Sequence, residues 1–241
     1  MKLILDFGNT LQKAVIYENE RQIHFESFSN ISIQNIKTLK EKFPALKSAI
    51  LSSVINESAE ISEYLRNNLY YVELTSKTPL PIINKYQTPE SLGKDRLAAA
   101  VAANHMHPGK NVLVIDAGSC ITYDLVNNKS EYLGGSISPG IDMRFRALNT
   151  FTGKLPLVSS RDIIPLTGQD TGTSVASGVL NGIVEEMKGI IDAYRTKYPG
   201  LMVILSGGDM KYFDKCLKNN IFAVSNIVIA GLNIILDFNL D

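Results

Sequence analysis

One short pattern occurs twice in this chain, and it limits the fold more than any other feature. Residues 3–6 read Leu-Ile-Leu-Asp and lead into Gly8, and residues 113–116 read Leu-Val-Ile-Asp and lead into Gly118. An apolar run that stops at turn residues predicts a buried strand. Asp116 follows Asp6 by 110 residues. Because repeats determine architecture, we expect two similar halves.

The likeness continues beyond the two aspartates. With the same offset, Leu3 corresponds to Leu113 and Val15 to Leu125. Each copy passes into a second apolar stretch, then a polar turn at 18–20 or 127–129, and then a third stretch. This order predicts that each half opens with three strands joined by hairpins.

Helical patterns between the strands favour an α/β fold. The sequence predicts helices at 32–43, 97–106, 141–152, 171–198 and 227–236. The turn at 107–110, His-Pro-Gly-Lys, predicts a boundary between a domain of residues 1–109 and a domain of residues 110–241.

The Asp-x-Gly turn has a chemistry of its own. Gly8 lets a phosphate approach the backbone, Asn9 and Thr10 add side-chain donors, and Asp6 can hold a hydrated Mg²⁺ that arrives with a nucleotide. A single turn of this kind is also an ordinary strand end. The second copy favours a nucleotide in a cleft between the halves.

The composition excludes several classes of partner. Lys plus Arg and Asp plus Glu both total 24 in 241 residues, so no excess charge indicates a nucleic-acid or membrane surface. The two cysteines, Cys120 and Cys216, lack metal-ligand spacing, which fits a reduced, cytoplasmic setting. The first residues lead straight into a strand, and no apolar run reaches the roughly 18 residues of a membrane span.

A second candidate site precedes the alanine-rich helix. The segment 78–89 contains three prolines and Tyr86, and residues 93–96, Gly-Lys-Asp-Arg, follow it. These four residues stand at a predicted helix N-terminus, where backbone donors favour a negative charge. In the second half, the glycine-rich run 134–140 predicts a loop that approaches something closely.

These motifs together resemble the type III pantothenate kinases, which belong to the actin-like and sugar-kinase ATPase superfamily. The resemblance covers nearly the whole chain and rests on five motifs: Asp6-x-Gly8-Asn9-Thr10, Gly93-x-Asp95-Arg96, Asp116-x-Gly118-Ser119, Gly134-Gly135-x-Ile137-x-Pro139-Gly140 and Thr171 before a long helix. It implies two duplicated ribonuclease H-like domains with the active site in the cleft between them. It also implies phosphorylation of pantothenate by ATP, the first step of coenzyme A biosynthesis.

The resemblance assigns roles to particular residues. It implies ATP contacts at Asp6, Phe7, Gly8, Asn9, Thr10, Leu11, Gln12, Lys13 and Ser119. It implies pantothenate contacts at Tyr86, Gly93, Lys94, Asp95, Arg96 and Thr171. It further implies a homodimer, Mg²⁺ with ATP, and a monovalent cation, K⁺ or NH₄⁺, held by Asp116.

The sequence departs from the family pattern at three places. Ser119 stands where the family usually has Thr, and it keeps the hydroxyl group. Cys120 stands where Ala is common, and Asp170 precedes Thr171 where Asn is more usual.

Phosphoryl transfer needs alignment, charge neutralisation and a base for the hydroxyl group. We assign the base to Asp95 and the pantothenate carboxylate to Arg96, whose planar guanidinium suits bidentate pairing. The alternative is that Asp95 and Arg96 are a helix-start carboxylate and a surface cation, and that Asp116 merely ends a strand. The three histidines, His24, His105 and His107, have no paired partner in the sequence and are interpreted as structural or solvated.

Other functions of the same superfamily stay open at this stage. Another small-molecule kinase would share the Asp-x-Gly turns but is not expected to carry the Gly-x-Asp-Arg motif after a proline-rich segment. A non-catalytic regulatory relative is expected to lose Asp95, which is present. A dinucleotide-dependent oxidoreductase is disfavoured, because no Gly-x-Gly-x-x-Gly follows a strand.

Overall fold

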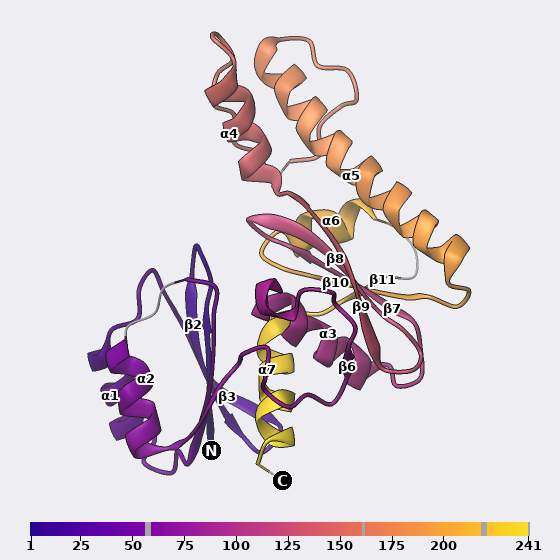
Figure 1. Cartoon of the computed structure of the whole chain (residues 1–241). Coiled ribbons are helices and arrows are strands. Elements are labelled where there is room, and N and C mark those ends of the chain that lie inside the picture. Colours follow the sequence, from indigo (N-terminus) through magenta and orange to yellow (C-terminus); the bar gives the residue numbers. More distant parts are fainter. Residues whose placement is uncertain (56–58, 161, 218–220, 241) are drawn as a thin grey trace. The chain divides into compact units, whose positions relative to one another are not determined.

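The computed structural model describes residues 1–55, 59–160, 162–217 and 221–240 (Figure 1). Contacts divide the chain into two compact units. The first comprises residues 1–106, 130–132 and 226–241, and the second comprises residues 107–129 and 133–225.

A five-stranded sheet with helices on both faces forms the first unit. Its strands are β1 (Lys2–Phe7), β2 (Gln12–Glu18), β3 (Arg21–Phe28), β4 (Ser48–Ser53) and β5 (Tyr70–Glu73). Its helices are α1 (Ile33–Lys42), α2 (Ala59–Asn68), α3 (Lys94–Met106) and α7 (Ile227–Phe238), with a single 3₁₀ turn at Pro89–Ser91. A two-residue strand, β6 (Ile83–Asn84), pairs in parallel with Glu131 and Tyr132.

Every residue of β1 is buried, which explains its unbroken apolar run. On one face, Leu3 and Leu5 join the core beneath α1 and α2. On the other face α7 contacts β1 and β4, and α3 packs against α7. An ion pair between Lys2 Nζ and the Asp237 carboxylate, 2.6 Å long, fixes the end of α7 to β1.

The second unit has its own sheet and its own core. Its strands are β7 (Val112–Ala117), β8 (Cys120–Val126), β9 (Glu131–Pro139), β10 (Met202–Ser206) and β11 (Ile221–Ala223), although the first two residues of β9 are grouped with the first unit. Its helices are α4 (Ile141–Phe151), α5 (Thr171–Lys197) and α6 (Met210–Cys216). The apolar stripe of α5 and the base of α4 cover the face of the sheet that carries Ile115 and Tyr123.

The two sheets have the same strand order. The first runs β3-β2-β1-β4-β5, and the second runs β9-β8-β7-β10-β11. In the second sheet, β6 is added at the edge next to β9. In both, the first two strands are antiparallel and the later crossover strands are parallel. The repeat seen in the sequence therefore corresponds to a repeated topology.

One detail of the predicted repeat is wrong. Leu3 pairs with Ile16 on the neighbouring strand, and Leu113 pairs with Leu125, so Leu125 corresponds to Ile16 and not to Val15. The reason is the turn: Phe7 faces Gln12 across the first hairpin, whereas Ala117 faces Ile121 across a hairpin one residue shorter.

Three further differences concern residues 130–241. The sequence placed residues 226–241 with the second half, but α7 is grouped with the first unit because it packs on β1 and β4. The predicted glycine-rich loop at 134–140 is the continuation of β9 as far as Pro139. Helix α6 was not predicted, because seven residues are too few to show a period.

Within the described residues, none of the helices combines the length and the apolar character that crossing a bilayer requires.

Candidate functional site

The β1–β2 hairpin carries the predicted ATP residues of the first unit. Asp6 is buried and pairs across the hairpin with Lys13, so their side chains lie on the same face of the sheet. The Gly8 N–H donates to the Leu11 carbonyl at 3.2 Å and closes the turn. Asn9 and Thr10 are exposed at the tip, where their polar groups can meet a ligand.

Gln12 behaves differently from the rest of that run. Its side chain is buried, its Oε1 accepts from the Ile31 N–H at 2.5 Å, and its Nε2 donates to Asn30 Oδ1 at 3.4 Å. These bonds hold the segment between β3 and α1 against the hairpin. The geometry therefore gives the Gln12 side chain a structural role. Only the backbone of Gln12 is then available for the predicted contact with ATP.

The predicted pantothenate residues of the first unit lie together at the start of α3. The Arg96 guanidinium lies over the Tyr86 ring, 5.8 Å from its centroid, and the Tyr86 ring lies 6.1 Å from that of Tyr132. Arg96 is buried, while Tyr86 and Lys94 are partly exposed. A cation held over an aromatic face keeps a fixed orientation. Tyr86 of the proline-rich segment and Arg96 of the Gly-x-Asp-Arg motif thus lie side by side.

Asp95 occupies the first turn of α3 with its carboxylate in a defined place. Its Oδ1 accepts from the Arg96 N–H at 2.9 Å. A Cβ added to Gly93 would lie 2.5 Å from that same Oδ1. The absence of a side chain at residue 93 is therefore what leaves room for the Asp95 carboxylate at the helix start.

In the second unit, three turns meet at the β7–β8 hairpin. The Gly118 N–H donates to the Cys120 carbonyl at 2.9 Å, and the Gly140 N–H donates to the Ser119 carbonyl at 3.1 Å. The Asp209 N–H donates to the Ala117 carbonyl at 3.0 Å. Added Cβ atoms at Gly140 and at Gly207, whose φ is +98°, would strike this hairpin.

Asp116 stands beside these turns at the end of β7. It is partly buried and pairs in register with Thr122 on β8 and with the buried Ser206 on β10. The convergence of the 206–209 turn with the Asp116 hairpin is a feature that the sequence did not predict. Each of the three turns has a glycine next to the end of a strand, and this shared feature is the signal that could have indicated their convergence.

Thr171 is the first residue of α5, and its exposed side chain is preceded by a well-formed cap. Asp170 Oδ1 accepts from the Thr173 N–H at 2.8 Å, and Thr173 Oγ1 accepts from the Asp170 N–H at 3.1 Å. The hydrogen bonds from Thr173 lower the pKa of the Asp170 carboxyl. Since Asp and Asn cap helices equally well, the departure at residue 170 keeps the position of Thr171.

The metal-binding capacity of the described residues is limited. Among them, no cluster of three or more His, Cys, Asp or Glu side chains could form a protein-made metal cage. Single carboxylates at Asp6 and Asp116 fit hard cations, which take oxygen ligands and, in the case of Mg²⁺, keep water and bind substrate phosphates. Such single carboxylates are compatible with a Mg²⁺ ion that arrives with ATP.

A partly buried ionic cluster supports the start of α4. Arg144 Nη2 lies 2.6 Å from Glu186 Oε2 on α5 and donates to Ser138 Oγ at 2.8 Å, while the Tyr123 hydroxyl donates to Glu186 Oε1 at 3.2 Å. Burial alone would raise the pKa of Glu186, but hydrogen bonds from Arg144 and Ser138 and the charge of Arg144 lower it. Burial, followed by the Glu186 charge, raises the pKa of Tyr123. No short motif marks this cluster, and the sequence analysis missed it.

Several solved structures have a similar fold. The chain resembles a Campylobacter jejuni protein named as a Baf family transcriptional activator (TM-score 0.64, 22% identity, 99% and 98% of the two chains). It also resembles the activator of 2-hydroxyisocaproyl-CoA dehydratase from Clostridium difficile with bound ADPNP (TM-score 0.56, 11%, 98% and 93%). A third is glucokinase from an Antarctic psychrotroph (TM-score 0.52, 12%, 98% and 98%). The fold is that of the sugar kinases and actin-like ATPases.

Sequence comparison narrows this class to one family. The model of the type III pantothenate kinases matches residues 2–193. Type III pantothenate kinases from Christiangramia forsetii and Phocaeicola vulgatus are 44% and 46% identical over 240 residues, each match covering 99% of both chains. The chain belongs to the type III pantothenate kinase family, and it is a kinase.

Proposed function

We propose that this protein transfers the γ-phosphoryl group of ATP to the hydroxyl group of pantothenate, giving 4′-phosphopantothenate, the first step towards coenzyme A. The observation that carries the proposal is the Asp95 carboxylate, held at the start of α3 beside Arg96 and Tyr86. Full-length similarity to enzymes named for this reaction supports it.

In this scheme Asp95 is the general base. Its Oδ1 is engaged by the Arg96 N–H, and the described residues place no hydrogen bond on Oδ2. Oδ2 therefore orients the pantothenate hydroxyl and takes its proton as the new oxygen–phosphorus bond forms and the bond to the β-phosphate oxygen breaks. Arg96 binds the pantothenate carboxylate, and Tyr86, Gly93, Lys94 and Thr171 complete the pocket.

ATP is assigned to the two Asp-x-Gly hairpins. The run from Asp6 to Lys13 and the hydroxyl of Ser119 are assigned to its phosphates, because backbone N–H groups in turns favour anions. The shared strand order of the two sheets supports a duplicated ribonuclease H-like domain.

Two kinds of cation belong to the proposal. Mg²⁺ arrives with ATP and neutralises charge on its phosphates. Asp116 is assigned to K⁺ or NH₄⁺, for which a carboxylate with neighbouring backbone carbonyls is a suitable oxygen donor set. Neither cation requires a preformed cage of several acidic side chains.

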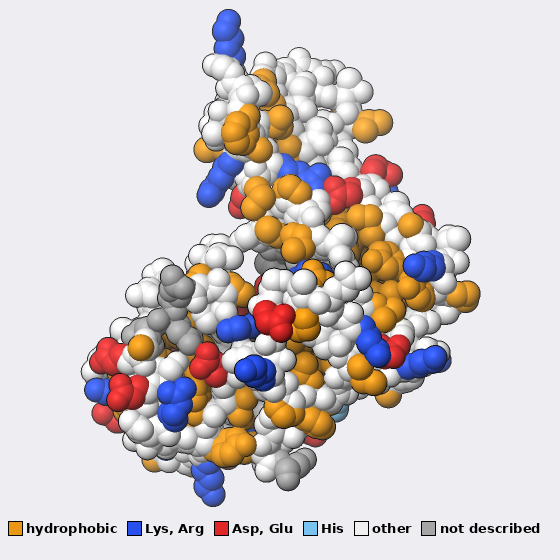
Figure 2. All heavy atoms as spheres, viewed as in Figure 1, with side chains coloured by type: hydrophobic (Ala, Val, Ile, Leu, Met, Phe, Trp, Pro, Cys, Tyr) orange, Lys and Arg blue, Asp and Glu red, His pale blue; other side chains and the backbone are white. Residues whose placement is uncertain are grey.

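We also assign the protein to the cytoplasm as a homodimer with no nucleic-acid or membrane partner. The second unit carries large apolar side chains that are exposed on α4 and on the segment after it, and Figure 2 shows orange side chains on the surface of its upper part. Phe151 is 86% exposed, Leu166 82% and Ile163 75%. Exposed apolar groups gathered in one region mark interaction surfaces. A second copy of the chain is the partner that the family implies.

The decisive experiment is a product assay. The purified protein is incubated with ATP, Mg²⁺, K⁺ and pantothenate, and the products are analysed by mass spectrometry. We expect phosphopantothenate, its phosphate on the hydroxyl, and no product when glucose or N-acetylmannosamine replaces pantothenate. Phosphorylation of a sugar, or no phosphorylated product at all, would refute the assignment.

A further inference from the structure

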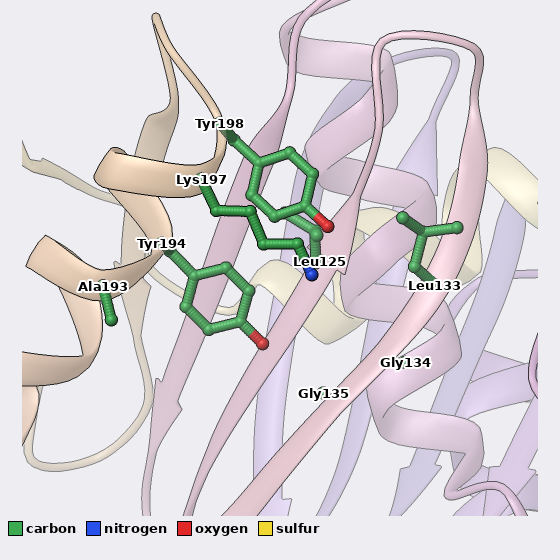
Figure 3. A pocket seen from close by; sticks show the side chains of 8 residues that line it. All are labelled: Leu125, Leu133, Gly134, Gly135, Ala193, Tyr194, Lys197 and Tyr198. Atoms are coloured by element: carbon green, nitrogen blue, oxygen red, sulfur yellow. The ribbon is translucent and has the colours of Figure 1, made fainter.

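A pocket of about 350 Å³ in the second unit contains none of the residues assigned to ATP, pantothenate or cations. It lies between β8, β9 and the last turns of α5 (Figure 3). Its volume is at the lower end of the range typical of small-molecule sites.

One part of the pocket is bare backbone. Gly134 has a φ of +95°, which side-chain-bearing residues rarely adopt. A Cβ on Gly135 would strike the Tyr123 carbonyl of the neighbouring strand. Neither position accepts a side chain without strain, so this stretch of β9 carries none: Gly134 is buried, and Gly135 and the Leu133 side chain are exposed.

The opposite wall is aromatic. Tyr194 and Tyr198 are one helical turn apart on α5, and their rings are nearly parallel, with centroids 6.2 Å apart and an angle of 22° between the planes. Figure 3 shows the Lys197 side chain running between the two rings, with its nitrogen on the same side as both hydroxyl groups. Lys197 Nζ lies 5.5 Å from the Tyr198 centroid.

Lys197 supplies the charge of the pocket. It forms no ion pair with a carboxylate of the described residues. The pocket therefore combines flat aromatic faces, an aliphatic side chain and one available cation. Such a surface complements a planar, apolar molecule with a single negative group.

We propose that this pocket is a binding site for small aromatic carboxylates, separate from the kinase site. The ring of the ligand lies against the side of the tyrosine pair that faces Leu133 and Gly135, and its carboxylate pairs with Lys197. Because the pocket is small and open, a ligand of two fused rings is expected to bind with a dissociation constant on the order of 1 mM.

The test uses 2-naphthoate as the probe and the neutral 2-naphthamide as its matched partner. Binding to the full-length protein is titrated by ligand-observed NMR. We expect Lys197→Met to weaken naphthoate binding at least about threefold and to leave naphthamide binding unchanged, because only the ion pair is lost.

A second pair of variants tests the location. Ala193→Phe places a ring into the pocket from α5, whereas Thr196→Phe places the same ring on α5 outside the residues that line it. We expect the first to abolish naphthoate binding and the second to leave it intact, with both proteins keeping their unfolding temperature. The proposal is overturned if Ala193→Phe and Thr196→Phe bind naphthoate equally well, or if Lys197→Met loses both ligands equally. It is also overturned if the wild-type protein shows no saturable binding at concentrations up to about 10-fold above the expected dissociation constant. Each of these outcomes counts whatever the kinase assay shows.

Discussion

Gly93 and Asp95 are arranged so that a Cβ on the glycine would lie 2.5 Å from Oδ1 of the aspartate. The same Oδ1 accepts the Arg96 N–H. The motif spacing thus has a steric meaning: the residue two places before the proposed base must leave room for its carboxylate. Because the obstructed atom ends a short, rotatable side chain, a larger residue would displace the carboxylate more than it would destabilise the helix.

Gly93→Ala is therefore expected to lower kcat by roughly tenfold while the unfolding temperature changes by no more than a degree or two, since a misplaced base loses catalysis before the fold is affected. Steady-state kinetics and thermal unfolding measure the two effects. Gly189→Ala, in the middle of α5 with open space around it, is the control and should keep wild-type turnover. Wild-type turnover in Gly93→Ala would show that the carboxylate position does not matter.

Asp95→Asn removes the proton acceptor and keeps the shape of the side chain. We expect kcat to fall by about two orders of magnitude or more, with the KM for pantothenate nearly unchanged. Glu60→Gln changes a charge in the first turn of α2 and controls for the general effect of a helix-start carboxylate. Near wild-type turnover in Asp95→Asn would remove Asp95 as the base.

The assignment of Asp116 predicts a dependence on monovalent cations. Activity should be high in K⁺ or NH₄⁺ and low in Na⁺ at the same ionic strength, because the larger ions fit an oxygen site of low charge. Asp116→Asn should lose most of this difference. Assays in the three chloride salts measure it, and full activity of the wild-type protein in Na⁺ alone would contradict the assignment.

The Glu186–Arg144 pair predicts how stability depends on pH. The folded-state pKa of Glu186 lies below its usual value of 4.5, so the pair stabilises the fold above about pH 4.5 and is lost as the pH falls through the folded-state pKa. Glu186→Gln should cost about 1–2 kcal/mol at neutral pH and reduce the loss of stability on acidification. Urea unfolding between pH 3 and 7 tests both effects.

The matched control for that pair is the neighbouring residue. Glu185 is 70% exposed and pairs with Lys188 at 2.7 Å, an exposed pair of little energetic value. Glu185→Gln should therefore be nearly neutral. If both variants behaved alike, the cluster around Arg144 would have no special stabilising role.

The exposed apolar side chains of the second unit predict the effect of charges on assembly. Phe151→Asp combined with Leu166→Asp should halve the molecular mass in light scattering, because desolvating two carboxylates opposes association. Ile23→Asp, at a partly exposed position on β3, should leave the mass unchanged. A dimer that persists in the double variant would place the interface elsewhere.

The sequence analysis predicted most of the elements because local signals mark them. The apolar run before Asp6, the alanine-rich stretch after Arg96 and the long stripe from Thr171 each correspond to a regular element in the structure. The family resemblance implied that Tyr86 and Arg96 bind one substrate, and in the structure the two side chains lie side by side. The proposed roles of these residues stay predictions.

The features that the sequence did not predict depend on contacts between segments far apart in the chain. The one-residue difference between the two hairpins is visible only when strands are paired, and Gly135 belongs to a strand because of the backbone that it faces on β8. The ionic cluster joins Tyr123, Arg144 and Glu186 from three separate elements. These partly buried charges are paired by the packing of the helices and the sheet, and their spacing along the chain carries no period.

The sequence alone determined the repeat and the class of fold, because hydrophobic periodicity and turn residues act over a few positions. The tertiary structure alone decided that α7 completes the first unit, that three turns meet at the Asp116 hairpin and that a tyrosine-lined pocket opens beside Gly134. These features depend on contacts between distant segments, and such contacts form only when whole faces of helices and sheets are buried together.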